Sequence, residues 1–491
     1  MHGAPKLAAG FTHFPYVDPD ARKGGRLRLG IQGAFDSLNP LIVRGAPAAG
    51  IRDFQVETLM VRGLDEAFTM YPLVAESVDM PADRSEVTFH LNPAAQFSDG
   101  RAITADDVIF SWELLRKHGR PNHRAYYGKV KRADRLGERS VRFVLDGSGD
   151  REMPLILAYM PVLAKHATDP DTFADTTSKP LLGSGPYIIA GFDLGRSITY
   201  RRNPDYWGRD LAVNRGRFNF DEIRYDYYRE ANVILEAFKN GSIDLRVEDD
   251  PATWTGAYGI PAVSDGRLVR RAFDIGLPAG MNGLVFNTRR DVFADKRVRS
   301  ALIRMLNFQW LNRSLYAGLY RRTESFFARS YLASSGRPAD ARERRLLAPY
   351  LDRVEPEILE GRYRFPDGTA AGQNRANQRA ALGLLEAAGY QLRDGQLVAK
   401  ATGRPLTFEI LINSGAQERL LASFVDDLAR IGVKARLRRV DATQYQSRLK
   451  SYDYDMIQVT TWTASLSPGN EQYFRFASSQ VRKEGTYNYA G

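Results

Sequence analysis

The sequence predicts an α/β protein of two lobes, with a subdomain inserted into the first lobe. The chain has 491 residues, which at roughly 150 residues per domain suggests three domains or two large lobes. Hydrophobic residues make up 43% and charged residues 26% of the chain, as in ordinary globular proteins. Strand-like runs alternate with amphipathic helical segments in two parts of the chain, and this order is typical of α/β layers.

The first part begins with an alternating strand at residues 26–31 and continues with a second strand at residues 87–91. Thr104 and Asp107 then form a capping box, with Thr104 as the N-cap and Asp107 at position N3. Apolar residues within 108–115 lie on one face of the helix that follows. We therefore expect a strand, a turn and a capped helix in this order.

The middle of the chain is dominated by strands. Residues 187–192 and 197–201 are predicted to form a hairpin. Residues 223–228, 232–240 and 243–247 follow as strand, helix and strand. These last three segments predict a βαβ unit.

The last third repeats this alternation with a stronger pattern. Strands are predicted at residues 406–412, 433–440 and 454–461, and helices at 420–431 and 442–451. The segment between the two α/β regions is charged and rich in Pro and Gly, which predicts a long surface excursion over residues 338–372.

These elements give a predicted division of the chain. Lobe I comprises residues 1–41 and 178–274, the inserted subdomain residues 42–177, and lobe II residues 275–486, with residues 487–491 returning toward lobe I.

Several classes of protein are excluded by composition. The longest apolar run, at residues 155–164, is far shorter than the roughly 20 residues that a membrane-spanning helix needs. The first residues do not form a charged segment followed by an apolar core, so the sequence does not show a signal peptide. The absence of cysteine removes disulfides and thiolate chemistry, and it suits an exported protein. The net charge is +11, but no long basic run is present, so we expect no nucleic-acid partner.

No catalytic signature is found. The HExxH, phosphate-loop and GxGxxG motifs are missing, and Ser184 lies between Gly183 and Gly185 rather than in the GxSxG spacing of a nucleophile elbow. His118 and His123 are five positions apart, which does not place them as an i,i+4 metal pair. Adjacent acidic pairs point in different directions and do not act as paired glycosidase carboxylates. We therefore predict a protein that is not an enzyme and has no cofactor, metal site or catalytic residue.

Several blocks of the sequence resemble the extracellular solute-binding proteins of family 5, which serve ABC importers for peptides and nickel. The resemblance covers nearly the whole chain, and the blocks occur in the family's order. They are residues 87–91 (VTFHL), 97–100 (FSDG), 103–112 (ITADDVIFSW), 183–187 (GSGPY), 202–207 (RNPDYW), 286–288 (FNT) and 293–299 (FADKRVR). The resemblance implies a two-lobe periplasmic binding protein fold of type II, cluster C.

Further blocks look like the Yej-type oligopeptide-binding subgroup: residues 11–14 (FTHF), 18–20 (DPD), 23–25 (KGG), 214–229 (NRGRFNFDEIRYDYYR) and 465–472 (SLSPGNEQ). This resemblance implies a periplasmic protein that captures oligopeptides or cell-wall muropeptides between its lobes and delivers them to the ABC transporter permease subunits. We expect a monomer. In relatives the chain continues for several tens of residues beyond the position of Gly491, which would complete lobe I.

The resemblance also implies ligand-binding positions. In relatives the segment after Leu-Asp-Pro lines the site, and the matching positions after Leu-Asn-Pro here are Arg44, Gly45 and Ala46. The oligopeptide binders commonly have an acidic residue where Arg44 stands. A guanidinium at this position would favour a carboxylate-bearing ligand through paired hydrogen bonds.

A second set of positions lies near the hinge of the relatives. Oligopeptide binders hold the ligand's α-ammonium group with an aspartate three residues after a tryptophan. Here Trp462 and Thr463 are followed by Ser465 in place of that aspartate, so an uncharged hydroxyl replaces the carboxylate. Glu248 would compensate from the first lobe. The expected site is completed by Tyr126, Tyr127 and Asn282.

Two alternatives to a peptide binder remain open at this point. Within the family, some relatives bind opines, so a sugar–amino-acid conjugate is the second candidate ligand. From another class, a peptidoglycan hydrolase would act in the same compartment, but it would need an acid–base pair or a metal.

Overall fold

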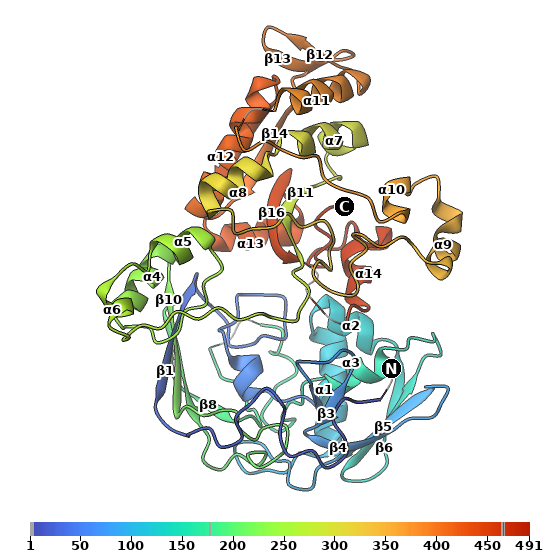
Figure 1. Cartoon of the computed structure of the whole chain (residues 1–491). Helices are drawn as coiled ribbons and strands as arrows, with labels where there is room; N and C mark the ends of the chain where they lie inside the picture. Colours follow the sequence, from blue (N-terminus) through green and yellow to red (C-terminus); the bar gives the residue numbers. More distant parts are fainter. Residues whose placement is uncertain (1–3, 176–177, 373, 463–464, 466) are drawn as a thin grey trace. The chain divides into compact units, whose positions relative to one another are not determined.

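The computed structural model describes residues 4–175, 178–372, 374–462, 465 and 467–491 (Figure 1). The chain divides into two compact units, Met1–Val247 and Glu248–Gly491, which we call unit 1 and unit 2. Residues 248–274, expected in lobe I, fall in unit 2 by this division. The finer lobe and subdomain boundaries stay predictions.

The first sheet of unit 1 has the strand order β1-β10-β9-β8. Its strands are β1 (Arg26–Gln32), β8 (Tyr187–Asp193), β9 (Ser197–Arg202) and β10 (Glu222–Tyr228). β1 runs parallel to β10, while β8 and β9 pair in antiparallel fashion, which confirms the predicted hairpin. The helix α4 (Ala231–Lys239) follows β10 as predicted.

The strand predicted at residues 243–247 is wrong. Only one isolated bridge, between Leu29 and Leu245, joins this segment to β1. The carboxylate of Asp244 accepts a hydrogen bond of 2.7 Å from the backbone N–H of Arg28 and also binds its guanidinium. A side chain thus takes a backbone donor that a strand partner would use.

A second, antiparallel sheet in unit 1 has the order β4-β5-β7-β6. Its strands are β4 (Ala75–Asp79), β5 (Glu86–Leu91), β6 (Val130–Arg135) and β7 (Ser140–Leu145), and a small hairpin is formed by β2 (Met60–Arg62) and β3 (Met70–Pro72). The helices here are α1 (Ala105–His118), α2 (Pro121–Tyr127) and α3 (Met153–Ala158). The predicted capping box of Thr104 and Asp107 is present, and Val108, Trp112 and Leu115 are buried in the core of unit 1.

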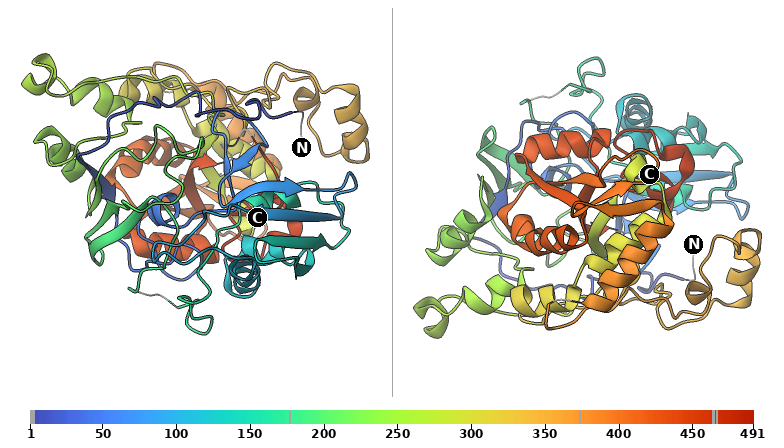
Figure 2. Two further views of the ribbon diagram at one scale, coloured as in Figure 1. Left: turned by 90° about the horizontal axis from the view of Figure 1, so that it is seen from below. Right: turned by 90° about the horizontal axis from the view of Figure 1, so that it is seen from above.

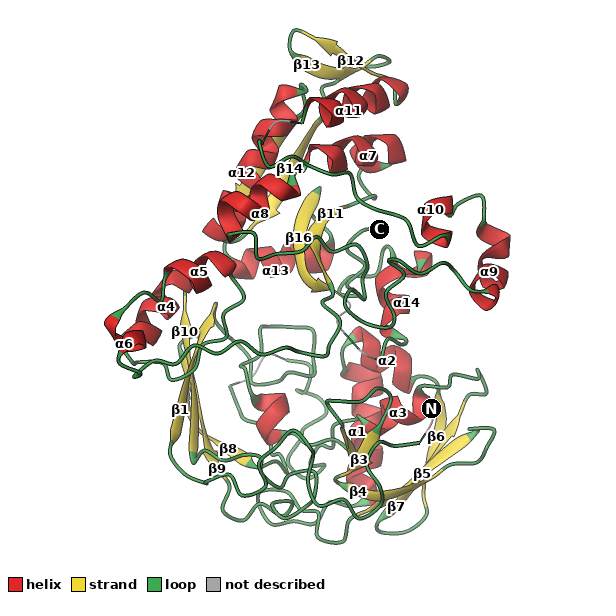
Figure 3. Ribbon diagram, viewed as in Figure 1, coloured by secondary structure: helices red, strands yellow, loops and turns green. Residues whose placement is uncertain are grey.

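The described residues between α3 and β8 form no helix or strand (green in Figure 3), yet they contain a tightly packed contact. The π-helix η1 (Ile51–Gln55) lies against residues 183–185, where the N–H of Gly185 donates to the carbonyl of Gln55 at 3.0 Å. A Cβ atom on Gly183 would lie 1.8 Å from that same carbonyl oxygen. The Gly-Ser-Gly motif is therefore a site of close backbone packing.

A buried carboxyl group of unit 1, that of Glu57, contacts the sequence block at residues 202–207. Glu57 is 8% exposed, and its side chain accepts hydrogen bonds from the Tyr206 hydroxyl and, at 3.0 Å, from Trp207 Nε1. Burial raises the pKa of Glu57 to about 7. The block at residues 202–207 therefore supplies donors to a buried carboxyl group.

Unit 2 is built on one sheet with the order β11-β16-β14-β15. Its strands are β11 (Met281–Phe286), β14 (Thr407–Ile412), β15 (Lys434–Arg439) and β16 (Met456–Trp462). β14 is parallel to both β15 and β16, and β11 is antiparallel to β16. The edge strand β15 exposes Lys434, Arg436 and Arg438.

Two long helices of unit 2, α12 (Gly415–Arg430) and α13 (Ala442–Ser451), confirm the predicted alternation. The unit also contains α7 (Lys296–Met305), α8 (Phe308–Tyr316) and α11 (Arg375–Ala387), which the sequence analysis did not predict. Leu421, Phe424 and Leu428 of α12 are buried in the core beside the sheet. The helices α7 and α11 pack side by side (Figure 2).

Shorter elements complete unit 2. These are α5 (Pro251–Gly256), α6 (Pro261–Ser264), η2 (Asp291–Phe293), α9 (Ala341–Leu347), η3 (Ala348–Tyr350), α10 (Pro356–Leu359), β12 (Tyr390–Arg393), β13 (Gln396–Ala399), α14 (Glu471–Phe476) and η4 (Ser478–Gln480). The helices α9, η3 and α10 bury no residue, as expected for a surface excursion over residues 338–372. No described helix combines the length and apolar composition needed to cross a membrane.

The last residues of the chain pack on unit 2. The N–H of Thr288 donates to the carbonyl of Ala490 at 2.7 Å, and the Tyr454 hydroxyl donates to the carbonyl of Tyr489 at 2.9 Å. The guanidinium of Arg289 donates to the carbonyl of Asn488 and lies over the Tyr452 ring, 3.9 Å from its centroid. Residues 487–491, expected to return toward lobe I, belong to unit 2 in this division.

Candidate functional site

The loop after β1 positions the first group of predicted site residues. The N–H of Ala46 donates to the Asp36 carboxylate at 2.6 Å, and the N–H groups of Asp36 and Ser37 donate to the carbonyl of Ala46 at 3.0 and 3.2 Å. Gly45 has a φ of 79°, in the left-handed region that favours glycine. Arg44, Gly45 and Ala46 thus lie on a turn closed by its own hydrogen bonds.

This loop is also fixed at its far end. The N–H of Ala49 donates to the Tyr227 hydroxyl at 2.8 Å, and the Tyr200 hydroxyl donates to the carbonyl of Ala49 at 2.5 Å. Tyr200 and Tyr227 belong to β9 and β10, so the sheet itself holds the loop in place. No sequence pattern indicates this role for Asp36, Tyr200 or Tyr227, because each contact joins residues that are distant in the chain or lie across the loop.

The side chain of Arg44 remains accessible. It is 72% exposed, and its guanidinium lies 3.5 Å from the carboxylate of Asp175, which is 63% exposed. An ion pair this exposed is weak. Arg44 can therefore exchange Asp175 for another carboxylate at little cost.

Tyr127 does not have the place that the sequence predicted. It is 3% exposed, stacks on the buried His123 at a centroid distance of 5.8 Å, and accepts a hydrogen bond from Trp112 Nε1 at its carbonyl. This aromatic residue fills the core of unit 1, so we do not retain it as a ligand contact. Tyr126 is half-buried against the same core.

In unit 2, Glu248 lies just before α5. Its carboxylate accepts hydrogen bonds from the N–H of Asp250 at 3.2 Å and from the Tyr258 hydroxyl at 3.0 Å. Asp250 in turn caps α5 by accepting from the N–H of Ala252 at 3.1 Å. Glu248 therefore has an ordered, half-buried carboxylate in the loop that begins unit 2.

Asn282 and the backbone of Trp462 lie at one end of the sheet in unit 2. Met281 pairs with Trp462 and Gly283 with Val459, and the register shifts between these two pairs. Such an irregularity re-aims the side chains of a strand. Asn282 is exposed and accepts a hydrogen bond from Gln458 Nε2 at 3.2 Å.

Ser465 and Thr463 follow this strand end. The Ser465 hydroxyl accepts a hydrogen bond of 3.0 Å from the N–H of Ser467, so it is used in a local turn. Thr463 lies outside the described residues. Among the described residues, no group of three or more His, Asp or Glu side chains is placed to hold a metal ion.

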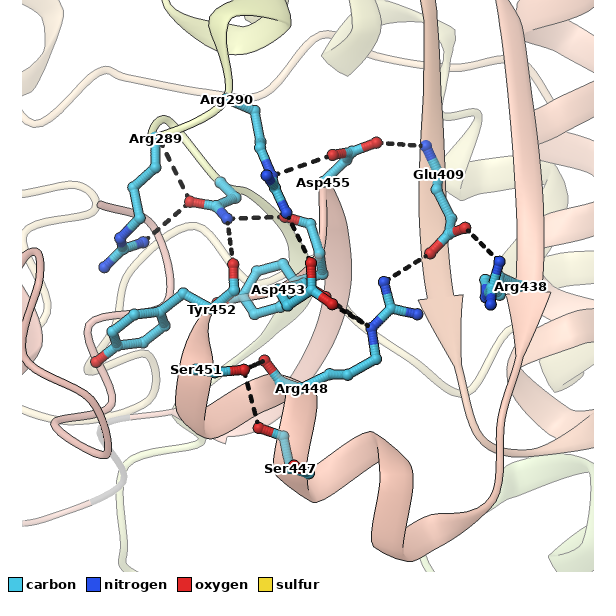
Figure 4. Close-up of polar contacts among 12 residues, drawn as sticks. Arg289, Arg290, Glu409, Arg438, Ser447, Arg448, Ser451, Tyr452, Asp453 and Asp455 are labelled. Atoms are coloured by element: carbon cyan, nitrogen blue, oxygen red, sulfur yellow. Dashed lines mark hydrogen bonds and ion pairs between the residues drawn. The ribbon is translucent and has the colours of Figure 1, made fainter.

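A charge network holds the opposite end of β16 (Figure 4). The carboxylate of Asp453 binds Arg290 at 3.0 Å and Arg448 at 3.2 Å, and Arg448 also binds Glu409 of β14 at 3.0 Å. The N–H of Glu409 donates to Asp455 at 2.9 Å. These contacts fix the start of β16, the strand whose other end is Trp462.

Comparison with known proteins identifies the family. Residues 69–483 match the bacterial extracellular solute-binding proteins, family 5. A putative binding protein of Brucella melitensis is 44% identical over 500 residues, covering 100% of this chain and 81% of the relative. The peptidoglycan-binding protein YepA of Agrobacterium fabrum is 43% identical over 506 residues, covering 100% and 82%. The probable peptide-binding protein YejA of the same organism is 39% identical over 501 residues, covering 100% and 80%.

The fold agrees with this assignment. The oligopeptide-binding protein AppA from Bacillus subtilis, solved with a nonapeptide, superposes with a TM-score of 0.73 at 21% identity, covering 96% of this chain and 84% of AppA. The predicted α/β fold of two-lobe periplasmic binding proteins is thereby confirmed, as is the resemblance on which it rested. The chain belongs to family 5 of the bacterial extracellular solute-binding proteins.

Proposed function

We propose that this protein is the periplasmic substrate-binding component of an ABC importer and binds peptides or peptide-containing cell-wall fragments. The observation that carries this proposal is the 43% identity to YepA, named as a peptidoglycan-binding protein, over 100% of this chain and 82% of YepA. The similarity to YejA, named as a probable peptide-binding protein, supports the same class of ligand. The permease subunits of the importer would receive the ligand.

The proposed ligand contacts are the positions that the resemblance to the family implies. Arg44 would bind a carboxylate of the ligand, since its own partner Asp175 is exposed and weakly held. Glu248 is the acidic member of the proposed set, and Ser465 stands where oligopeptide binders have their aspartate. The remaining members of the proposed set are Gly45, Ala46, Tyr126, Asn282, Trp462 and Thr463.

The test is native mass spectrometry of the protein as purified from its own cells, which reads the mass of any retained ligand. A peptide or muropeptide mass supports the proposal, and an opine-like conjugate contradicts it. The same muropeptides incubated with the protein should be recovered unchanged. New cleavage products would instead favour the hydrolase alternative.

The Arg44→Ala substitution should weaken the binding of an anionic peptide by about 1–3 kcal/mol, the scale of one lost charged hydrogen bond. Isothermal titration calorimetry measures this difference. Arg22→Ala is the matched control, because Arg22 is also exposed in unit 1 and makes no ion pair among the described residues. Equal affinities of the wild type and Arg44→Ala would show that Arg44 is only a surface charge.

Blocking the amino terminus of a peptide should cost less affinity here than in a binder that has the aspartate. A hydroxyl at Ser465 offers no charge to pair with an ammonium group, so acetylation removes little. Titrating free and N-acetylated forms of one peptide measures the loss, and the Ser465→Asp variant should increase it. A loss above about 3 kcal/mol in the wild type, the scale of an unpaired buried charge, would show that another acid such as Glu248 holds the amine.

A further inference from the structure

A pocket of about 610 Å³ that is half open to solvent, called the cavity below, lies in unit 1 at the carboxyl ends of β1 and β10. Its lining consists of Gly33 and Ala34 after β1, residues 194–196 in the turn between β8 and β9, and residues 226–229 at the end of β10. Its volume is within the range of small-molecule sites, about 300–1,000 Å³. Carboxyl ends of neighbouring parallel strands are also where open α/β sheets bind ligands.

Backbone hydrogen bonds hold the walls of this cavity in place. The N–H of Gly33 donates to the carbonyl of Tyr228 at 2.8 Å, and the N–H of Tyr227 donates to the carbonyl of Arg196 at 2.7 Å. Gln32 Nε2 donates to the carbonyl of Arg229 at 3.2 Å. The three wall segments are thus tied to one another before any ligand arrives, which lowers the entropic cost of binding.

The charges of the lining favour an anion. Asp226 is neutralised by Arg224, whose guanidinium lies 2.9 Å from its carboxylate. Arg196 lies 3.6 Å from Asp193, but the two side chains are 82% and 60% exposed. Arg229 forms no ion pair with any other residue that the structure describes. The guanidinium groups of Arg196 and Arg229 therefore line this cavity, and that of Arg229 is available to a ligand.

From these features we propose that the cavity binds a carboxylate carried on a small, partly apolar body. A guanidinium pairs a carboxylate through two parallel hydrogen bonds. Ala34 and the exposed Leu194 give the lining an apolar surface, which suits the apolar part of such a ligand. The block at residues 214–229, prominent in the sequence, ends in this lining. Two kinds of ligand carry such a carboxylate, an acidic sugar and a short acidic peptide. Only the choice of these two rests on the proposed function.

The experiment uses paired probes that differ in the carboxylate. N-acetylmuramic acid is compared with neutral N-acetylglucosamine, and acetyl-Ala-Glu with acetyl-Ala-Gln-amide, by protein-observed NMR titration of the full chain. We expect one acidic probe to shift signals of residues lining the cavity and to bind at least tenfold more tightly than its neutral partner. The pair of probes that shows this difference identifies the ligand as an acidic sugar or an acidic peptide.

Variants of the lining make the assignment specific. Arg229→Gln should weaken the acidic probe at least tenfold, Ala34→Trp should abolish its binding by filling the cavity, and the control Arg22→Gln should leave it unchanged. Overturning results are no binding of either acidic probe, equal binding of acidic and neutral probes, or unchanged binding by Arg229→Gln. Peptide binding that the Arg44→Ala substitution leaves unchanged would instead count against the proposed function. It would not count against this cavity, because Arg44 is outside it.

Discussion

Gly183→Ala is expected to destabilise unit 1 by roughly 3–5 kcal/mol, at the upper end of what single substitutions do. The new Cβ would lie 1.8 Å from the carbonyl oxygen of Gln55 and 2.7 Å from its carbonyl carbon. Both are backbone atoms of η1, so no flexible side chain can move aside. Relief would require displacement of η1, whose carbonyl at Gln55 also accepts the hydrogen bond from Gly185.

Urea unfolding followed by circular dichroism measures the free energy of unfolding, and hydrogen exchange with mass spectrometry assigns the loss to unit 1. Gly137→Ala is the control, because a Cβ at Gly137 would meet no atom within 4 Å. Equal stability of the Gly183→Ala variant and the wild type would contradict the close packing of residues 183–185. It would also reopen a different role for Ser184, which lies between the two glycines.

Acidification should destabilise unit 1 through His123, by on the order of 5 kcal/mol between pH 6.5 and pH 3. Burial, together with the nearby positive charges of Arg52 and Arg120, lowers the pKa of His123 to about 3. Below its ordinary pKa of 6.5 the unfolded chain therefore binds a proton that the folded chain does not. Folding stability is lost as the pH falls through this window and is fully present above it.

The measurement is the free energy of unfolding from pH 3 to pH 8 for the wild type and for His123→Phe, which keeps a ring beside Tyr127 but does not titrate. Between pH 4 and 6.5, the free energy of unfolding should change less with pH in the variant than in the wild type. Glu57 acts in the opposite direction, because its raised pKa of about 7 makes the folded state hold the extra proton between its ordinary value of 4.5 and 7. Identical pH profiles for wild type and His123→Phe would contradict a neutral, buried His123.

Local sequence patterns predicted part of the regular structure. The capping box at Thr104 and the alternation of β14, α12, β15, α13 and β16 depend on nearby residues, and the structure contains them. The strand at residues 243–247 was wrong because the Asp244 side chain reaches a backbone donor of β1. Hydrophobic alternation does not reveal such a competing contact.

The candidate site was less predictable for a related reason. The turn at Arg44 depends on Asp36 and on tyrosines of β9 and β10 that are far away in the chain. Tyr127 looked like a ligand contact because aromatic residues serve both binding sites and cores, and its place in the core comes from packing against His123. The cavity at the carboxyl ends of β1 and β10 is formed by three separate segments, so no single sequence window shows it.

The exposed edge of β15 bears on how copies of this protein behave in concentrated solution. Lys434, Arg436 and Arg438 lie along a strand with an unpaired side. Two such edges approaching each other would bring rows of like charge together, which opposes the growth of a shared sheet. This colloidal protection operates through a screened field, whose range is about 10 Å at 0.1 M salt and about 3 Å at 1 M. Concentrated salt therefore weakens the barrier to edge-to-edge aggregation, while dilute buffer preserves it.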